Sequence, residues 1–400
     1  MKKLLLIITV ALYTNFSNAQ WVATTGHSVQ NRNCIAVSGA NIFIGTGGAG
    51  VYLSTDNGVT WSAVNSGLTA TDVTSLAISG INIFAGTTGG MFLSTNNGAT
   101  WSSIDTGLTS TFIQSIAISG ANIFVGTGGP FPGGAFLSTN NGVSWTAVNT
   151  GLTDLTVYSL AISGTNIFAG TDAGGVFLST NNGASWSTVN TGLTTSFPIL
   201  SLIINGTDIF AGTNGAGVFL SSNSGVSWSS INSGLSDNQI LSLVINGTNI
   251  FAGTGYGGIF LSTNYGISWI PENAGLTISA NVPSLAIKGT NVFAGTCDSS
   301  GVGAVWIRPL SEMTGIEEIQ QEISLIIAPN PFEEETTINF TEEQKNIAIK
   351  IIDITGREIK TINFTGKQLI IEKGEMKSGI YFVQGSDENR DVFNKKIVVQ

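Results

Sequence analysis

The chain has 400 residues, of which 51 are glycine and only 10% are Asp, Glu, Lys or Arg. Its formal net charge is −10. The weakly acidic balance of residues 20–312 argues against nucleic acid and anionic membrane surfaces as partners, because both are themselves negative. A chain this rich in glycine and this poor in charge suits many short strands joined by tight turns, so we expect an all-β fold.

The first residues have the pattern of a signal peptide, which we place at residues 1–19. Lys2 and Lys3 precede an apolar run, and the small residues Ser17 and Ala19 stand where signal peptidase prefers them, before Gln20. The alternative is an N-terminal membrane anchor, but the apolar run is short for a helix that spans a bilayer. We therefore expect export and a mature chain without a transmembrane segment.

A unit of about forty residues then recurs along the chain. Its marker, NIFAGT or a close variant, surrounds seven phenylalanines: Phe43, Phe84, Phe124, Phe168, Phe210, Phe251 and Phe293. In one copy, four apolar runs separated by Gly, Asn and Ser clusters read as strands, at Ser159–Ser163, Asn166–Gly170, Val176–Ser179 and from Ser185 onward. Four strands per repeat are typical of a propeller blade.

The number of copies of a second sequence motif indicates that the repeats close into a ring. The turn typified by STNNGATW ends at six tryptophans: Trp61, Trp101, Trp145, Trp186, Trp228 and Trp269. A seventh, Trp21, stands alone near the start of the mature chain. A linear solenoid has no use for this displaced fragment, whereas a propeller uses it to complete its last blade. We predict a seven-bladed propeller in which the segment after Gln20 pairs with Ala304–Ile307.

The turn before each of these tryptophans has residues that bond back to their own backbone. The first polar positions of the six turns are Asp56, Asn96, Asn140, Asn181, Asn223 and Asn264. We interpret them as turn formers with no catalytic role. The string resembles the Asp-box (BNR-type) repeat of sialidase-like propellers, and the resemblance spans nearly all of residues 21 to 310. Five of the six boxes carry Asn where the family prefers Asp.

The composition changes after Met313. Residues 20–312 hold three Lys or Arg against ten Asp or Glu, whereas residues 313–400 hold ten against fifteen. We therefore place the propeller at 20–310, a linker at 311–322 and a second domain at 323–400. Its alternating apolar segments, with turns at Thr355–Arg357 and at Ser378 and Gly379, predict a small Ig-like β-sandwich.

This last segment resembles the C-terminal sorting domain of cargo for the type IX secretion system. The resemblance rests on Pro329, Asn330 and Pro331 at the start, DITGRE in the middle and SGIYFV before the final strand. It implies Sec export, passage across the outer membrane with the secretion machinery as partner, and a secreted or cell-surface location in a Gram-negative bacterium. Release and surface attachment stay open as alternatives.

Few residues could support catalysis or metal binding. Sialidase-like propellers bind the substrate carboxylate with an arginine cluster, and residues 20–312 offer only Arg32 and Arg308. We therefore expect no sialidase activity and, more broadly, that the chain is not an enzyme. His27 is the only histidine. This argues against a histidine-rich metal site and against a conventional catalytic triad that would use a second histidine. No metal and no cofactor are expected.

The face opposite the Asp-boxes carries the remaining candidates. Its carboxylates are Asp72, Asp154, Asp172, Asp237 and Asp298, and its aromatic residues are Phe112, Phe131 and Tyr256. A pair of carboxylates would suit a glycosidase, and the alternative is that they are solvated loop residues or turn formers. Exposed rings beside short polar groups can stack on sugars, unless they fold back onto the core.

From this face we predict a binding module for a neutral glycan or a protein. The candidate ligand-binding residues are Asp172, Tyr256, Asp298, Phe131 and Asp72. The alternatives are a glycoside hydrolase or other glycan-processing enzyme, and a structural surface protein.

The two cysteines, Cys34 and Cys297, fall on the same face of adjacent blades. Because an exported protein is in an oxidising environment, one hypothesis is a disulfide that locks the ring. The alternative is two independent small core residues.

Overall fold

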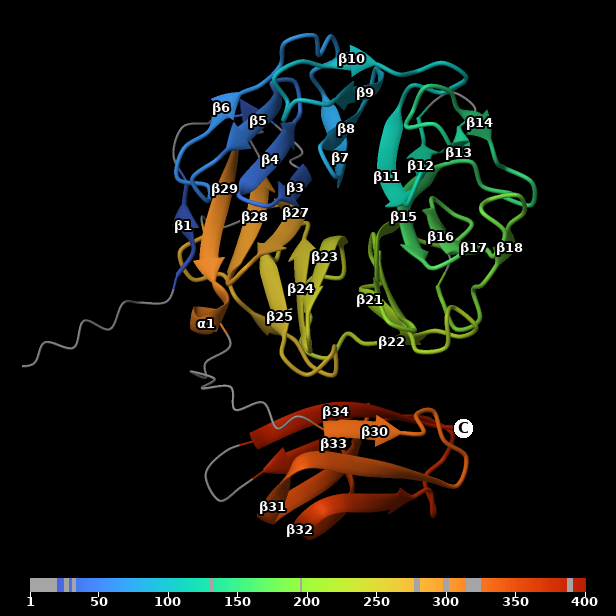
Figure 1. The fold of residues 1–400 in the computed structure, drawn as a ribbon, viewed down its shortest axis with the longest axis vertical. Coiled ribbons are helices and arrows are strands. Elements are labelled where there is room, and N and C mark those ends of the chain that lie inside the picture. The colour runs from blue at the N-terminus through green and yellow to red at the C-terminus, as the bar shows by residue number, and fades with distance from the viewer. Residues whose placement is uncertain are drawn as a thin grey trace, which may run out of the picture.

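The computed structural model describes residues 20–24, 29–30, 34–129, 133–194, 196–276, 281–297, 302–313, 325–386 and 391–400. Seven antiparallel sheets form a ring, and a further sheet lies beside it (Figure 1). The single helix in these ranges is the short α1 (Leu310–Met313). This confirms the predicted all-β propeller with a small C-terminal β domain. The predicted signal peptide, together with His27, Arg32, Phe131 and Asp298, lies outside the described residues.

Each blade has four strands from the ring's inside to its outside. Blades 1 to 3 comprise β3 (Cys34–Ser38), β4 (Asn41–Thr46), β5 (Gly50–Ser54) and β6 (Ser62–Ala63); β7 (Val73–Ser79), β8 (Asn82–Thr87), β9 (Gly90–Ser94) and β10 (Ser102–Ser103); and β11 (Ile113–Ser119), β12 (Asn122–Thr127), β13 (Gly134–Ser138) and β14 (Thr146–Ala147). Blades 4 to 6 comprise β15 (Val157–Ser163), β16 (Asn166–Thr171), β17 (Val176–Ser179) and β18 (Ser187–Thr188); β19 (Ile199–Asn205), β20 (Asp208–Thr213), β21 (Val218–Ser221) and β22 (Ser229–Ser230); and β23 (Ile240–Asn246), β24 (Asn249–Thr254), β25 (Ile259–Ser262) and β26 (Ile270–Pro271). Blade 7 comprises β27 (Asn281–Lys288), β28 (Asn291–Cys297) and β29 (Val302–Pro309), with β1 (Val22–Ala23) and β2 (Val29–Gln30) both paired to β29.

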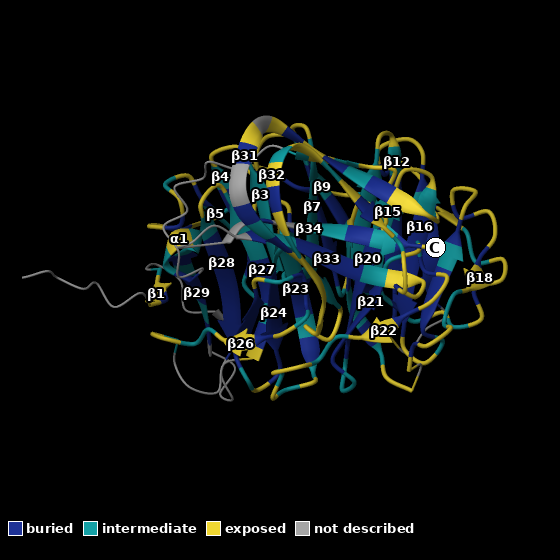
Figure 2. Cartoon of the chain, turned by 90° about the horizontal axis from the view of Figure 1, so that it is seen from below, coloured by how far each residue is buried: buried dark blue, intermediate teal, exposed yellow. Residues whose placement is uncertain are grey.

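The blades pack through the repeated aromatic residues. Each marker phenylalanine on a second strand is fully buried or nearly so, because neighbouring blades cover both faces of that strand. Each repeat tryptophan lies at the outer edge and donates its indole N–H across to the preceding blade; for example, Trp101 Nε1 lies 2.7 Å from the carbonyl oxygen of Val64. A buried indole needs such an acceptor. The second strands are accordingly buried along most of their length, whereas the inner strands are mainly half-buried and the short outer strands are exposed (Figure 2).

The ring closes as the sequence predicts. Val22 and Ala23 pair with Ile307 and Trp306 on β29. Trp21 is 2% exposed, and its indole N–H donates to the carbonyl oxygen of Glu272 at 2.7 Å. It thus makes the same contact to the preceding blade that the other repeat tryptophans make, and it is the seventh member of their set.

The second domain has five strands: β30 (Leu325–Ala328), β31 (Glu335–Asp353), β32 (Glu358–Glu372), β33 (Gly379–Ser386) and β34 (Asp391–Val399). The long β31 pairs with β30, β32 and β33, and β33 pairs with β34. A bridge between Phe332 and Val399 brings the two edges together, so the sheet nearly closes around its own apolar core. The arrangement is the predicted sandwich in a more closed, barrel-like form.

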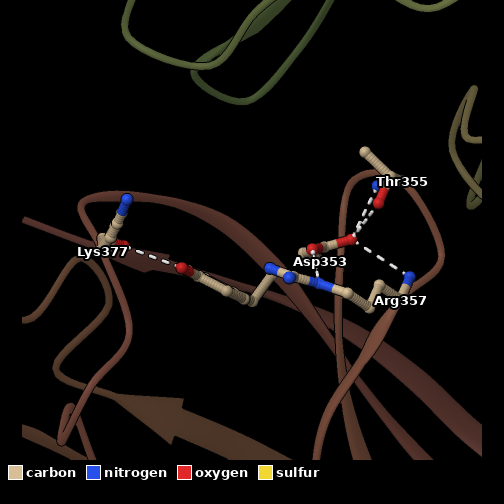
Figure 3. A network of polar contacts seen from close by, with 5 residues as sticks. Asp353, Thr355, Arg357 and Lys377 are labelled. Carbon is tan, nitrogen blue, oxygen red and sulfur yellow. Dashed lines mark hydrogen bonds and ion pairs between the residues drawn. The ribbon is translucent and has the colours of Figure 1, made fainter.

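The DITGRE segment forms the turn between β31 and β32 (Figure 3). Asp353 Oδ1 accepts the backbone N–H groups of Thr355 and Arg357 at 2.9 and 3.1 Å, and Arg357 Nε donates to Oδ2 at 3.0 Å. Burial opposes the charged carboxylate, but these donors outweigh it and hold the pKa of Asp353 below its ordinary value. The motif is therefore a self-contained turn, as predicted.

The cysteine hypothesis is corrected by the structure. Within the described residues no disulfide joins Cys34 and Cys297. Cys34 takes the place of a serine that most repeats carry at the start of the inner strand, and its thiol faces Val73 of the next blade, 3.9 Å from the carbonyl oxygen. It therefore points away from blade 7, where Cys297 lies, and burial raises the pKa of the Cys34 thiol to about 12.

Candidate ligand-binding face

The Asp-box turns satisfy their polar groups internally. Asp56 Oδ1 accepts from the Ser54 hydroxyl at 2.8 Å and from the Thr60 backbone N–H at 2.9 Å, while the Thr60 hydroxyl donates to Oδ2 at 2.6 Å. The donors of Thr60 and Ser54 lower the pKa of Asp56 to about 2. The carboxylate is thus committed to the turn.

The five Asn-containing boxes make the equivalent bonds. In each, the Asn side-chain oxygen accepts from the hydroxyl two residues before it and from the backbone N–H four residues after it; the acceptors are Asn96, Asn140, Asn181, Asn223 and Asn264. The residue after the first polar position has positive φ in all six copies. These turns are structural, and their end of the propeller is nearly uniform.

The loops at the opposite end share a backbone but differ in side chains. In blades 2 to 6 the N–H that follows the second strand donates to the carbonyl of the residue that precedes the inner strand. The acceptor residues are Asp72, Phe112, Thr156, Pro198 and Gln239, and the donor residues are Thr88, Gly128, Asp172, Asn214 and Gly255. One scaffold therefore presents a different side chain at each blade.

Two of the candidate carboxylates hold these loops in shape. Asp237 Oδ2 accepts the backbone N–H groups of Tyr256 and Gly257 at 2.7 and 2.8 Å, and Oδ1 accepts from Gln239 at 2.9 Å. Burial works against the charge, but the three donors prevail and lower the pKa of Asp237. Asp154 makes the same set of bonds in blade 4. Both carboxylates act as loop locks.

The lock on blade 6 presents Tyr256 to solvent. Its side chain is 79% exposed although its backbone is fixed. Beside it, Gln239 Nε2 donates to Asn214 Oδ1 at 2.7 Å and so joins the loops of blades 5 and 6. Phe197, 36% exposed, covers Gly215 so closely that a Cβ there would lie 2.7 Å from the ring.

Two of the predicted ligand-binding residues lie on equivalent loops at the same end of the propeller. Asp172 and Tyr256 are both exposed on the loops that follow the second strands of blades 4 and 6. Between them lie three residues that the sequence interpretation missed: Phe197, Asn214 and Gln239. We call these five residues the loop arc. Asn214 directly follows the second strand of blade 5, and Gln239 directly precedes the inner strand of blade 6. Comparison of the repeats at these two positions would have identified both residues.

The other predicted residues do not join the loop arc. Asp72 is half-buried and bridges to Gly47, which places it between blades 1 and 2. Phe112 is half-buried against Gly129 in blade 3. This agrees with the alternative in which the ring folds back onto the core. Phe131 and Asp298 lie outside the described residues.

Two further regions differ in character from the loop arc. A cavity of about 470 Å³ runs between the inner strands of blades 4 to 7, and its lining is aliphatic, with Leu160, Leu202 and Leu243 among the residues. Arg308 is buried in an ion pair with Glu272, at 2.8 Å, and so fastens β29 to the end of blade 6. In the described part of the chain, no group of three or more metal-ligating side chains converges.

Two family models match the chain. The secretion system C-terminal sorting domain matches residues 326–400, and the BNR/Asp-box repeat matches residues 52–63. Both recognitions made from the sequence are therefore confirmed. Within the described residues, no helix has the length and apolar character needed to cross a membrane.

Solved structures with a similar fold come from different kinds of protein. The extracellular domain of a one-component system from B. thetaiotaomicron has a TM-score of 0.58 at 12% identity, over 96% of this chain and 59% of that one. YCF48 from Cyanidioschyzon merolae has a TM-score of 0.55 at 18% identity, over 73% and 98%. The GH74 xyloglucanase from Xanthomonas campestris has a TM-score of 0.55 at 12% identity, over 93% and 66%. At these identities the likeness is one of fold.

One curated relative is an endo-acting ulvan lyase from Formosa agariphila. It is 27% identical over 100 residues, which span 23% of this chain and 19% of the lyase. Together with the xyloglucanase, it contradicts our expectation that the chain is not an enzyme. That expectation rested on the missing arginine cluster, on the single histidine and on the interpretation of the carboxylates as loop residues, and it was wrong. The chain is a secreted or surface-displayed seven-bladed Asp-box β-propeller with a type IX secretion system sorting domain at its C-terminal end.

Proposed function

We propose that the propeller binds a neutral glycan through the loop arc. The observation that carries this proposal is Tyr256, a ring exposed to solvent on a loop that Asp237 fixes through two backbone bonds. A side chain of this kind loses little conformational freedom when it contacts a ligand, because the backbone beneath it is already ordered.

The other residues of the loop arc suit hydroxyl-rich ligands. The amides of Asn214 and Gln239 and the carboxylate of Asp172 offer donors and acceptors for hydroxyl groups, and Phe197 offers a second ring for stacking. The propeller segment is also poor in cations, with three Lys or Arg between residues 20 and 312. Both features favour a neutral sugar over an anionic one.

The test is a glycan array probed with the chain from Gln20 onward, followed by titration calorimetry on the polysaccharides that bind. Tyr256→Ala and Phe197→Ala should each weaken binding. A matched control is Ile81→Ala, which also removes an exposed apolar side chain, 72% exposed, but from the Asp-box end. Equal affinity in the wild type and both arc variants would move the binding site elsewhere.

A second candidate function, glycan processing, is favoured by the match to the ulvan lyase. The arc contributes one carboxylate to it, Asp172, which is not one of the two loop locks. Product release from each bound polysaccharide should therefore be measured in parallel, by reducing ends and by ultraviolet absorbance of unsaturated products. Turnover that Asp172→Asn abolishes while binding persists would assign catalysis to the arc.

A further inference from the structure

The sorting domain packs against the Asp-box end of blades 5 and 6. In the sheet register, Ile352, Phe382 and Lys396 are cross-strand partners on β31, β33 and β34, so they form one row on the same face. Phe382 and Ile352 join the apolar cluster of blades 5 and 6 that contains Tyr265. In the view from below, β33 and β34 lie across these blades (Figure 2).

The two propeller residues at the centre of this contact depart from the repeat. The first residue of the second strand is Asp208 in blade 5, whereas the six other blades have Asn41, Asn82, Asn122, Asn166, Asn249 and Asn291. The residue after the first polar position of the Asp-box is Tyr265 in blade 6, whereas the other boxes have Asn57, Asn97, Asn141, Asn182 and Ser224. We call Asp208 and Tyr265 the docking pair.

Burial changes at the same two positions. The six asparagines are half-buried, but Asp208 is 0% exposed. Tyr265 is 8% exposed at a position that is exposed or half-buried in the other boxes. It also has a φ of +61°, a conformation that is rare for an aromatic residue. The copies without a neighbouring sorting domain carry small polar residues there.

Lys396 completes a charged contact with the docking pair. Its ammonium forms an ion pair with Asp208 Oδ2 and lies 5.8 Å from the centre of the Tyr265 ring. The Tyr265 hydroxyl donates to the same Oδ2 at 2.6 Å, and the ring lies 6.2 Å from that of Phe382. Asp208 Oδ1 has no hydrogen-bond partner among the described residues, so the carboxylate depends on these two donors.

We propose that the docking pair is a dedicated binding site on the propeller for the chain's own sorting domain, with Lys396 and Phe382 as the recognised side chains. A buried carboxylate is costly without a partner charge, and an aromatic residue at positive φ is strained. The repeat elsewhere avoids both features, and both are compensated only where the sorting domain lies. The propeller and its sorting domain are thereby held as one body by side-chain contacts as well as by the connecting segment.

The test uses the chain from Gln20 to Gln400 and restores the repeat residues. Asp208→Asn and Tyr265→Asn introduce what most other blades carry, so the propeller should keep its fold, which far-ultraviolet circular dichroism and tryptophan fluorescence would check. Lys396→Met removes the charge from the other side. Each variant should raise the equilibrium constant for undocking by on the order of 100-fold, since each leaves a partner group uncompensated.

Two measurements report docking. Small-angle X-ray scattering should show a larger maximum dimension in the three variants, and acetylation of Lys396 in the two propeller variants should speed up relative to the exposed Lys350. The matched control is Asn166→Asp, which makes the same exchange in reverse on blade 4 and should leave both readouts unchanged. Scattering and acetylation identical to wild type in Asp208→Asn and Tyr265→Asn would overturn the proposal.

Discussion

The two ends of the propeller differ in how the repeat varies. At the Asp-box end, six turns make the same side-chain hydrogen bonds, so the oxygen of the Asp or Asn is bonded within its own turn. At the loop end, only the backbone bond is repeated, while the residue that accepts it changes from Asp to Phe, Thr, Pro and Gln. The side chains that are the same in all six turns are those that the blade needs in order to fold. The side chains that vary at the loop end are not needed for folding and are available for recognition.

The exceptions at the uniform end strengthen this distinction. Asp208 and Tyr265 break the pattern, and both lie under the sorting domain. A departure from the repeat therefore coincides with a contact outside the repeat. The same logic, applied to the loop end, supports our proposal that the loop arc binds a ligand.

The largest expected effect concerns a residue common to all blades. Trp21→Ala should destabilise the propeller by about 3–5 kcal/mol, because it empties a buried indole site and opens the ring at β1. Trp186→Ala, which removes the equivalent side chain from blade 4, is the matched comparison. Urea denaturation would measure both, and a Trp21 variant as stable as wild type would show that the ring does not depend on this closure.

A smaller effect should separate the two kinds of carboxylate at the loop end. Asp237→Ala should cost about 1–3 kcal/mol, because three backbone N–H groups lose their acceptor. Asp172→Ala should change stability by less than about 0.5 kcal/mol, since its side chain is exposed. Thermal unfolding followed by circular dichroism would compare them. Equal costs would mean that Asp172 is also a structural residue.

Tyr256→Ala should leave the folding stability unchanged and weaken glycan binding by about 1–3 kcal/mol. The reason is that the ring is exposed, so its loss empties no core site. Calorimetric titration of the array-selected polysaccharide would measure the affinity. The Ile81→Ala control should bind as wild type does.

The smallest effect is a pH dependence confined to one Asp-box. The pKa of Asp56 falls from 3.8 to about 2 in the folded chain, so its bonds stabilise the fold above the unfolded-state value. That contribution is lost as pH falls through about 2. Asp56→Asn, which copies the other five boxes, should flatten the stability curve between these values in urea titrations. An unchanged curve would mean that the carboxylate contributes nothing to the turn.

The sequence predicted the parts of the fold that repetition encodes. Seven phenylalanine markers, six boxes and the displaced Trp21 were enough to predict the ring and its closure, because each copy repeats the evidence. The predicted inner strand from Ser159 begins at Val157 in the structure, since a bulge lets the strand start earlier. Boundaries of this kind depend on local backbone geometry that the pattern does not record.

The candidate site was less accessible from the sequence. Tyr256 and Asp172 are recognisable as exposed loop residues, but the pairing of Gln239 with Asn214 joins residues 25 positions apart on different blades. The role of Asp208 depends on Lys396, 188 residues away. Contacts between units of a repeat and a second domain are invisible in the repeat itself.

Two tyrosines of blade 6 test most directly whether the ends of the propeller have separate roles. Tyr256 and Tyr265 flank β25, the first at the loop end and the second at the Asp-box end. Glycan affinity and domain docking would be measured on Tyr256→Ala and Tyr265→Asn in the same full-length chain. We expect Tyr256→Ala to lose affinity with the sorting domain still docked, and Tyr265→Asn to undock the sorting domain with affinity intact. Loss of both properties in either variant, or of neither in both, would contradict this division.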